Sequence, residues 1–172
     1  MNNTVQEPIH EEVNVFIEIG KNSNIKYEYD HKINALVCDR VLHTPFKYPF
    51  NYGFIPNTLS LDSDPLDVVV LMDDELVPGC QINCKIIGCL ETKDDAGNDP
   101  KIITCPSNKV DPTYNSINEI SDVPAHMIEK IKYFFLHYKD LENKHVQLGN
   151  TLNKQEAISI YKDAIELYNR EK

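Results

Sequence analysis

Two segments near the start of the chain alternate hydrophobic and polar residues with the two-residue period of a β-strand. They are residues 13–19 and 25–30, and a Gly-Lys-Asn-Ser-Asn sequence between them is typical of a turn. The pattern therefore predicts a β-hairpin. If the two strands pair, Glu18, Lys26 and Glu28 gather on one side of it, where a solvated outer face is the simpler interpretation.

Further segments rich in Val and Ile follow, separated by Pro, Gly, Asn and Asp. They occupy residues 35–40, 66–72, 81–91 and 101–105. Short strands at this spacing predict a small barrel or a strongly bent antiparallel sheet. The Pro-rich segment 45–56 contains Tyr48 and Tyr52, which by themselves suggest ordinary aromatic packing.

The last third of the chain changes to a helical period. One helix is predicted to begin at Pro124, with Ser121 or Asp122 as its N-cap. Its hydrophobic stripe comprises Met127, Ile128, Ile131, Phe134, Phe135 and Tyr138. A second helix is predicted from Asn153, with Glu156 completing a capping box. Its stripe comprises Ala157, Ile158, Tyr161, Ile165 and Tyr168. Strands followed by packing helices indicate an α+β fold.

Length and composition indicate one globular domain over residues 1–172, with 41% hydrophobic and 26% charged residues. The net charge of −10 argues against a nucleic acid or an anionic membrane as the main partner. No apolar run approaches the ~20 residues that span a bilayer. The polar residues 1–12 lack the features of a signal peptide, so a cytoplasmic protein is expected. The five cysteines contain no CxxC pair, which favours buried structural roles over metal or redox roles.

Three carboxylates stand within six residues in the sequence Asp-Ser-Asp-Pro-Leu-Asp, as Asp62, Asp64 and Asp67. A second acidic group, residues 94–99, follows downstream. Like charges that converge need a positive counterpart, and hard divalent cations such as Mg²⁺ prefer carboxylate oxygens. An EF-hand is excluded, because position six from Asp62 is Asp67 rather than Gly. A solvated acidic turn remains the alternative for both groups, more so for residues 94–99.

Basic and phenolic residues could complement these carboxylates around a phosphate compound, because cations neutralise its charge and phenols bind its oxygens. The candidates are Lys26, Arg40, Lys47, Lys101, Lys139, Tyr48, Tyr52 and Tyr138. Taken singly, each Lys is expected to be a surface residue. The scattered histidines do not suggest zinc, and no glycine-rich nucleotide loop or GxSxG elbow occurs.

Together these motifs resemble the family I soluble inorganic pyrophosphatases, and the resemblance covers the chain from about Val13 to Leu141. The central motif is D-x-D-P-x-D at residues 62–67. Flanking motifs stand in the same order: Phe16-Ile17-Glu18-Ile19, Ile25-Lys26-Tyr27-Glu28, Asp39-Arg40, Tyr48-Pro49, Asn51-Tyr52-Gly53-Phe54-Ile55-Pro56, residues 94–101 and His137-Tyr138-Lys139-Asp140-Leu141.

The resemblance implies a five-stranded, highly twisted OB-like β-barrel with flanking C-terminal helices, and Mg²⁺-dependent hydrolysis of pyrophosphate to two phosphates. It implies Asp64 as general base for the attacking water. The implied metal ligands are Asp62, Asp67, Asp94 and Asp99. The implied substrate ligands are Lys26, Arg40, Tyr52, Lys101, Tyr138 and Lys139, with Glu18, Glu28, Tyr48 and Asp95 in supporting positions. The short length is similar to that of homohexameric prokaryotic members.

Two departures from the family pattern stand out. Asp95 occupies a position where members often have Glu, and the chain lacks the Trp that many bacterial members carry after the Tyr138-Lys139 motif. Two rival functions remain open at this stage. One is a two-metal hydrolase of another phosphate compound, and the other is an OB module that binds divalent cations or oligonucleotides without catalysis. The net charge and the lack of a basic face with interleaved aromatics argue against the oligonucleotide reading.

Overall fold

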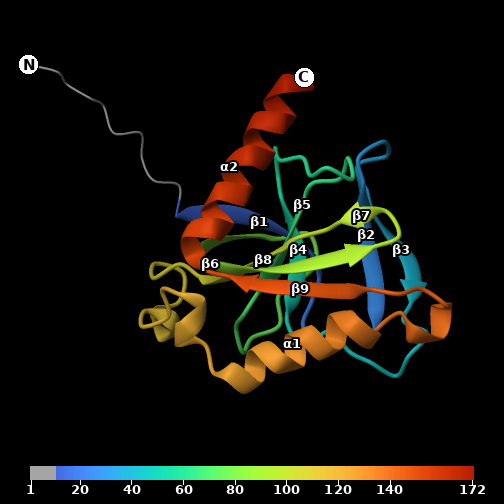
Figure 1. Ribbon diagram of the computed structural model, residues 1–172, viewed down its shortest axis with the longest axis horizontal. Coiled ribbons are helices and arrows are strands. Elements are labelled where there is room, and N and C mark those ends of the chain that lie inside the picture. The colour runs from blue at the N-terminus through green and yellow to red at the C-terminus, as the bar shows by residue number, and fades with distance from the viewer. Residues whose placement is uncertain (1–10) are drawn as a thin grey trace, which may run out of the picture.

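The computed structural model describes residues 11–172 (Figure 1). The prediction that a signal peptide is absent concerns residues 1–12, of which 1–10 lie outside the described part. The strands are β1 (Glu12–Ile19), β2 (Ile25–Asp30), β3 (Ala35–Val41), β4 (Asn51–Ile55), β5 (Leu66–Val70), β6 (Gln81–Asp94), β7 (Gly97–Asn98), β8 (Lys101–Pro106) and β9 (Gln147–Leu152). The α-helices are α1 (Ala125–His137) and α2 (Lys154–Arg170), and short 3₁₀ turns are η1 (Pro112–Tyr114), η2 (Ile120–Asp122) and η3 (Asp140–Glu142).

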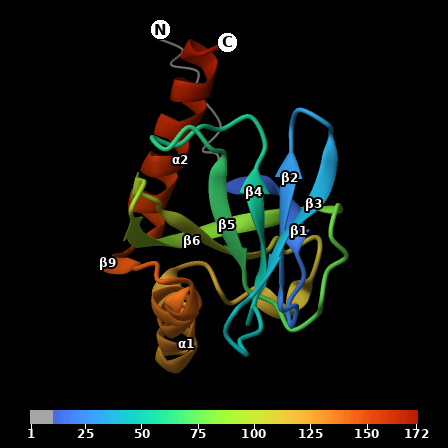
Figure 2. The same ribbon diagram turned by 90° about the vertical axis from the view of Figure 1, so that its right-hand side faces the viewer.

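Five strands close into a ring, so the predicted five-stranded barrel is confirmed. Their order is β1-β4-β5-β8-β6, and β1 pairs with β6 to complete the circle. The pairing of β5 with β8 is parallel, whereas the other pairings of the ring are antiparallel. The sheet is therefore not wholly antiparallel. Both helices lie on one side of this ring in Figure 2, and the β2–β3 pair stands on the other.

The predicted hairpin between the first two strands is wrong. β2 pairs with β3 in a separate two-stranded sheet, while β1 pairs with β4 and β6. The cause is burial, because Val13, Val15 and Ile17 are each at most 3% exposed and so belong inside the ring. Glu18 nevertheless meets β2, since its Oε2 accepts the backbone N–H of Tyr29 at 2.7 Å. The predicted grouping of Glu18 with this strand thus arises without strand pairing.

Three strands, β4, the two-residue β7 and β9, were not predicted. Every residue of β4 is buried, so its sequence shows no alternation, and it lies in a Pro-rich segment. Gly53 marks its closest approach to β1. A Cβ atom at Gly53 would lie 1.8 Å from the carbonyl oxygen of Phe16, next to a register shift between Ile17 and Ile19. Glycine therefore lets the two backbones touch at this bulge.

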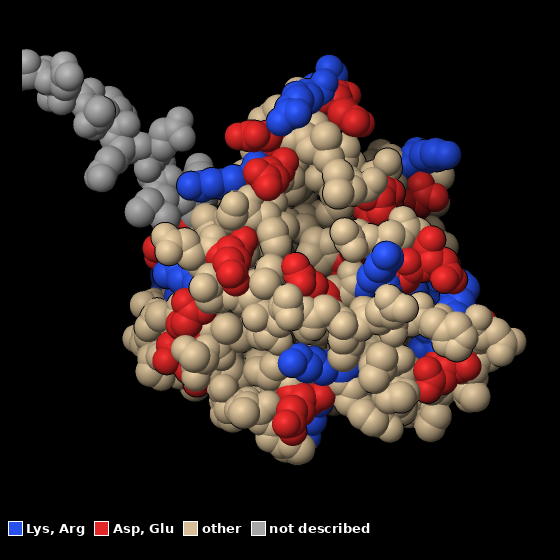
Figure 3. Space-filling view, viewed as in Figure 1, with Lys and Arg blue, Asp and Glu red and all other residues tan. Residues whose placement is uncertain are grey.

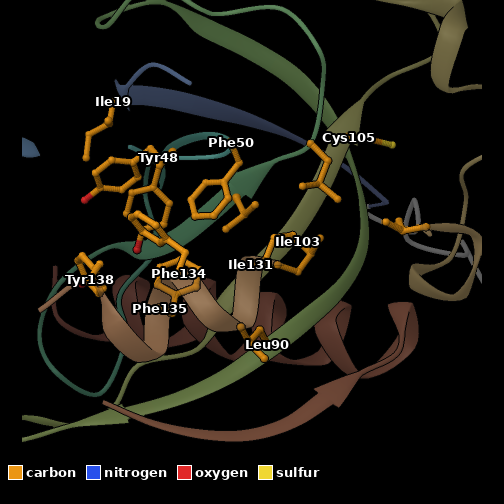
Figure 4. Close-up of a cluster of buried hydrophobic side chains, with 14 of the residues drawn as sticks. Ile19, Tyr48, Phe50, Leu90, Ile103, Cys105, Ile131, Phe134, Phe135 and Tyr138 are labelled. Carbon is orange, nitrogen blue, oxygen red and sulfur yellow. The ribbon is translucent and has the colours of Figure 1, made fainter. Parts of the chain in front are cut away.

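An aromatic cluster fills the space between α1 and the barrel (Figure 4). The ring of Phe50 stacks on Phe135 at 5.3 Å between centroids, Tyr48 lies 4.7 Å from Phe134, and Phe134 stacks on Tyr138 at 5.0 Å. A second cluster packs α2 against residues of the barrel strands through Ala157, Ile158 and Ala164. The helix stripes predicted from the sequence are thus largely the faces that cover the barrel.

The two helix starts differ in their outcome. Asn153 caps α2 and Glu156 completes the capping box, as predicted. The prediction of a side-chain cap on α1 is wrong, because Pro124 holds the N-cap position without a side-chain hydrogen bond. Asp122 instead closes η2, where its carboxylate accepts the backbone N–H of Glu119. Met127, assigned to the buried stripe, is 43% exposed. Within residues 11–172, no helix is both long and apolar enough to cross a membrane.

We expect Gly53→Ala to lower the free energy of unfolding by ~3 kcal/mol or more, because the added methyl group meets backbone that cannot move without breaking the β1–β4 pairing. Urea unfolding followed by circular dichroism measures the change. Thr151→Ala, at an exposed position of β9, is the control and should stay within ~0.5 kcal/mol of wild type. Equal stabilities of the two variants would contradict this account of Gly53.

Candidate active site

The parallel pairing of β5 with β8 brings the central carboxylates together with a lysine. Asp67 stands opposite Lys101 in register, and Asp99 lies two residues before Lys101. The Lys101 ammonium lies 2.7 Å from Oδ2 of Asp67 and 2.7 Å from Oδ2 of Asp99. The lysine side chain is only 6% exposed. One buried cation therefore bridges two of the predicted metal ligands.

Aromatic rings surround this ammonium. Its nitrogen lies 5.4 Å from the ring centroid of Tyr52 and 5.6 Å from that of Phe135, within cation–π range. Burial acts to lower the pKa of Lys101, but Asp67, Tyr52 and Asp99 raise it well above its ordinary value. The lysine is therefore positively charged throughout the physiological pH range.

Asp62 and Asp64 lie on the tight turn that precedes β5. Oδ1 of Asp62 accepts the backbone N–H of Asp64 at 3.0 Å, and Ser63 between them has a left-handed φ of 70°. Burial raises the pKa of Asp62, with Asp99 adding to the effect. Burial and the charge of Asp62 likewise raise the pKa of Asp64. The turn thus directs two carboxylates toward the same acidic region as Asp99.

The acidic group at residues 94–99 forms the hairpin between β6 and β7. Oδ1 of Asp94 accepts the backbone N–H of Ala96 at 2.9 Å, and Asp95 is exposed in the turn. Asp99 is fixed at the far end, where its backbone carbonyl accepts the hydroxyl of Thr92. Burial raises the pKa of Asp99 to about 6, although the charge of Lys101 acts against it. Residues 94–99 therefore form a turn and also contribute carboxylates to the candidate site, so the two interpretations do not exclude each other.

Glu18 adds a further buried carboxylate. Burial raises its pKa to about 7, while the hydrogen bond from Tyr29 lowers it and the charge of Asp67 raises it further. The charges of Glu28 and Lys26 also act on the Glu18 carboxylate. The predicted group of Glu18, Lys26 and Glu28 therefore lies near Asp67. Burial thus raises the pKa of Glu18, as it does those of Asp62, Asp64 and Asp99.

Three tyrosines wall the site on the side of the aromatic cluster. Burial raises the pKa of Tyr48 and of Tyr52 far above the ordinary phenol value, and raises the pKa of Tyr138 to about 12. The charge of Asp67 raises the pKa of all three phenols, and the charge of Lys101 lowers it. The phenols are therefore neutral and can donate hydrogen bonds to an anion without adding charge.

The remaining predicted substrate ligands form a basic group next to the tyrosines. Lys26 lies 3.5 Å from Asp39, which also pairs with Arg40. Lys139 packs over the ring of Tyr138 at 5.3 Å. Burial lowers the pKa of Lys139, and the charges of Lys101, Arg40 and Lys26 lower it further. Such mutual repulsion shows that these cations converge.

The structure adds three residues that the sequence prediction missed as members of the site. They are Asp39, which pairs with two of the cations, Phe135, which underlies Lys101, and Glu142, whose Oε1 lies 2.7 Å from Nε of Arg40. Asp39 stood beside Arg40 in a recognised motif and could have been included. No sequence signal separated Glu142 from ordinary surface glutamates.

The carboxylates suit a hard divalent cation. Over the described residues 11–172, no three Asp, Glu, His or Cys side chains are already gathered as a metal site, and Lys101 lies between Asp67 and Asp99 instead. The available donors are carboxylate oxygens, without His or Cys, which is the ligand chemistry of Mg²⁺. The raised pKa of Asp99 shows that more positive charge would stabilise the group.

A cavity of about 580 Å³ lies elsewhere, between α2, β9 and the segment before Asp62. Its lining includes Leu59, Leu66, Leu148 and Leu167 and is mainly apolar. Its lining includes residues next to both acidic segments, such as Leu61 and Asn98, but none of the predicted metal or substrate ligands. On the face shown in Figure 3, acidic and basic side chains are interspersed without a continuous basic surface. The charged side chains, not this cavity, define the candidate site.

Comparisons with known proteins agree with one another. A family model described as inorganic pyrophosphatase matches residues 15–169. The chain is 49% identical over 157 residues to an inorganic pyrophosphatase of Saccharolobus solfataricus, covering 91% of each chain, and 46% identical over 155 residues to one of Helicobacter pylori, covering 90% of each. A solved Helicobacter pylori inorganic pyrophosphatase superposes with a TM-score of 0.90 at 44% identity, over 92% of this chain and 94% of that one. The solved inorganic pyrophosphatase of Thermus thermophilus superposes with a TM-score of 0.90 at 35% sequence identity, over 96% of this chain and 95% of that one.

In EDTA, we expect stability to fall as pH rises from about 4.5 to 7. Folded Glu18, with a pKa of about 7 against 4.5 when unfolded, keeps a proton in this range that the unfolded chain has released. Raising the pH therefore disfavours the folded state, by up to ~3 kcal/mol from this group, and Asp99 acts in the same direction.

Urea unfolding at several pH values measures the slope. Glu18→Gln keeps the acceptor for Tyr29 but cannot ionise, so its stability should depend less on pH. Glu166→Gln, whose side chain is 66% exposed on α2, should retain the wild-type slope. Identical slopes for Glu18→Gln and wild type would show that Glu18 does not titrate as described.

Proposed function

The chain belongs to the inorganic pyrophosphatase family and hydrolyses inorganic pyrophosphate, and from this premise we propose how its residues perform the reaction. The observation that carries the proposal is the meeting of an acidic group around Asp67 with a basic group around Lys139, joined by Lys101. Carboxylates suit the metal that this family requires, and cations suit a phosphate anion. We extend the proposal to one catalytic domain over residues 1–172.

We propose that Mg²⁺ is the metal and that four carboxylates hold it. They are Asp62 on the turn before β5, Asp67 in β5, and Asp94 and Asp99 around the β6–β7 hairpin. When bound, the metal supplies Lewis-acid chemistry that activates water and screens the charge of the substrate. Lys101 contacts Asp67 and Asp99 in the structure, and we propose that it turns to a phosphate oxygen when these carboxylates ligate metal.

Asp64 is the proposed general base. It lies between two proposed metal ligands in the sequence, on an exposed turn where water can reach its carboxylate. Burial and the neighbouring charges of Asp62 and Glu28 raise its pKa above the ordinary aspartate value. A raised pKa makes the carboxylate a stronger base, which suits a group that accepts a proton from the attacking water.

The basic and phenolic residues are the proposed substrate ligands. Lys26, Arg40, Lys101 and Lys139 would neutralise phosphate oxygens, including the charge that develops on the leaving phosphate. Tyr52 and Tyr138 would donate from neutral hydroxyl groups, as their raised pKa values support. The residues proposed to support this arrangement are Glu18, Glu28, Tyr48 and Asp95.

We further propose a cytoplasmic homo-oligomer, a hexamer by resemblance to short prokaryotic members. All five cysteines are free thiols, which suits a reducing compartment. The outer side of α1 and the turn after it expose Tyr133 and Leu141, at 59% and 64%. Large apolar side chains exposed at the surface are compatible with subunit contact. Sedimentation of the purified protein distinguishes a hexamer from smaller forms.

Purified protein should release phosphate from pyrophosphate with Mg²⁺, and excess EDTA should abolish the release, because the carboxylates cannot activate water alone. A colorimetric phosphate assay measures both conditions. Tripolyphosphate and a phosphate monoester, tested at equal concentration, discriminate the rival phosphohydrolase. Equal or faster release from either rival substrate would overturn the assignment of pyrophosphate. Release that persists in EDTA would overturn the metal requirement.

Asp67→Asn should reduce kcat by at least ~10³-fold while the far-UV circular dichroism spectrum stays unchanged, because the amide keeps the shape but loses the charge for both metal and Lys101. Steady-state phosphate release measures the effect. Asp163→Asn on the exposed side of α2 is the matched control and should retain activity. Lys93→Ala should also retain it. A fully active Asp67→Asn enzyme would remove Asp67 from the proposed metal site.

A further inference from the structure

Glu142 is a nearly buried carboxylate that the proposed reaction does not use. Its side chain is 6% exposed, and its Oε2 is buried without a hydrogen-bond partner among the described residues. Its Oε1 lies 2.7 Å from Nε of Arg40. An anion buried with so few hydrogen bonds is costly unless a nearby cation compensates it. Arg40 is that cation, so the position of Glu142 makes sense only together with Arg40.

The guanidinium of Arg40 directs two of its nitrogens at carboxylates and leaves the third without a hydrogen-bond partner among residues 11–172. Nη1 pairs with Asp39 on one side, and Nε faces Glu142 on the other. Nε makes no aligned hydrogen bond, so Glu142 holds it by charge at close range. Nη2 is buried and has no hydrogen-bond partner in residues 11–172. One end of the fork is therefore left for a further acceptor.

The backbone ties Glu142 to the other proposed phosphate ligands. Glu142 ends η3, where its N–H donates to the carbonyl oxygen of Lys139 at 2.9 Å, and Asn143 closes the turn with a left-handed φ of 54°. Lys139 stands next to Tyr138 at the end of α1. The contact with Arg40 thus links β3 to the segment that carries Tyr138 and Lys139.

We infer that Glu142 is a positioning residue, which fixes the Arg40 guanidinium so that Nη2 can donate to a phosphate oxygen of pyrophosphate. The inference rests on the proposed role of Arg40 as a substrate ligand. Glu142 itself does not touch the substrate, because a carboxylate would repel a phosphate. Its effect on binding therefore exists only while Arg40 is present, which a double-mutant cycle measures directly.

The test compares Glu142→Gln, Arg40→Ala and the double variant with wild type. The probe is methylenediphosphonate, whose bridging carbon resists hydrolysis, titrated calorimetrically in the presence of Mg²⁺. We expect Glu142→Gln to weaken binding about tenfold, which corresponds to ~1.4 kcal/mol, and to raise KM for pyrophosphate by more than it lowers kcat. In the Arg40→Ala background, the same substitution should change neither affinity nor KM.

Glu166→Gln is the matched control, because it removes the acidic partner of a surface arginine, Arg170, at 3.4 Å. It should bind the probe as wild type does. Glu142→Asp keeps the charge and should restore part of the affinity, and it replaces Glu142→Gln in the cycle if that variant does not fold. Wild-type affinity in the Glu142 variants, or an equal loss with and without Arg40, would overturn the inference. Because binding is measured without turnover, an inactive wild-type enzyme would count against the proposed function and leave this cycle decisive.

Discussion

The structure depends on one buried ammonium held between two carboxylates. Lys101 reaches both Asp67 and Asp99 because β5 and β8 run parallel at this point of an otherwise antiparallel ring. Without the lysine, two carboxylates would face each other in a poorly solvated place, at a cost of several kcal/mol. The parallel pairing and the charge arrangement therefore support each other: the strands place the three side chains, and the ion pairs hold the strand ends.

The aromatic cluster gives this interaction its strength. Phe135 and Tyr52 pack in the hydrophobic core and also lie against the ammonium of Lys101. Excluding water there strengthens electrostatic contacts and also raises the pKa of Tyr138 to about 12, which keeps a phenol neutral beside charged groups. Core and site thus share side chains. A substitution in the face of α1 would act on stability and on electrostatics together.

How much the sequence could predict follows from the range of each interaction. Alternation revealed strands such as β2, and local spacing revealed the capping box of α2, because both patterns depend on near neighbours. The fully buried β4 shows no alternation, and the partner of β1 depends on closure of the ring, so the hairpin prediction failed. In the site, the acidic motif was visible as a cluster. The contact of Arg40 with Glu142 joins residues about a hundred positions apart and leaves no local pattern.

The net charge of −10 hides two local excesses of opposite sign. On one side, burial and neighbouring carboxylates raise the pKa of Asp64 and Asp99; on the other, burial and neighbouring cations lower the pKa of Lys139. On each side, burial together with repulsion between like charges thus disfavours the ionised groups. A divalent cation relieves the first and a polyvalent anion relieves the second, so a metal complex of pyrophosphate relieves both at once. The arrangement of charges in the folded chain therefore suits this complex better than either ion alone.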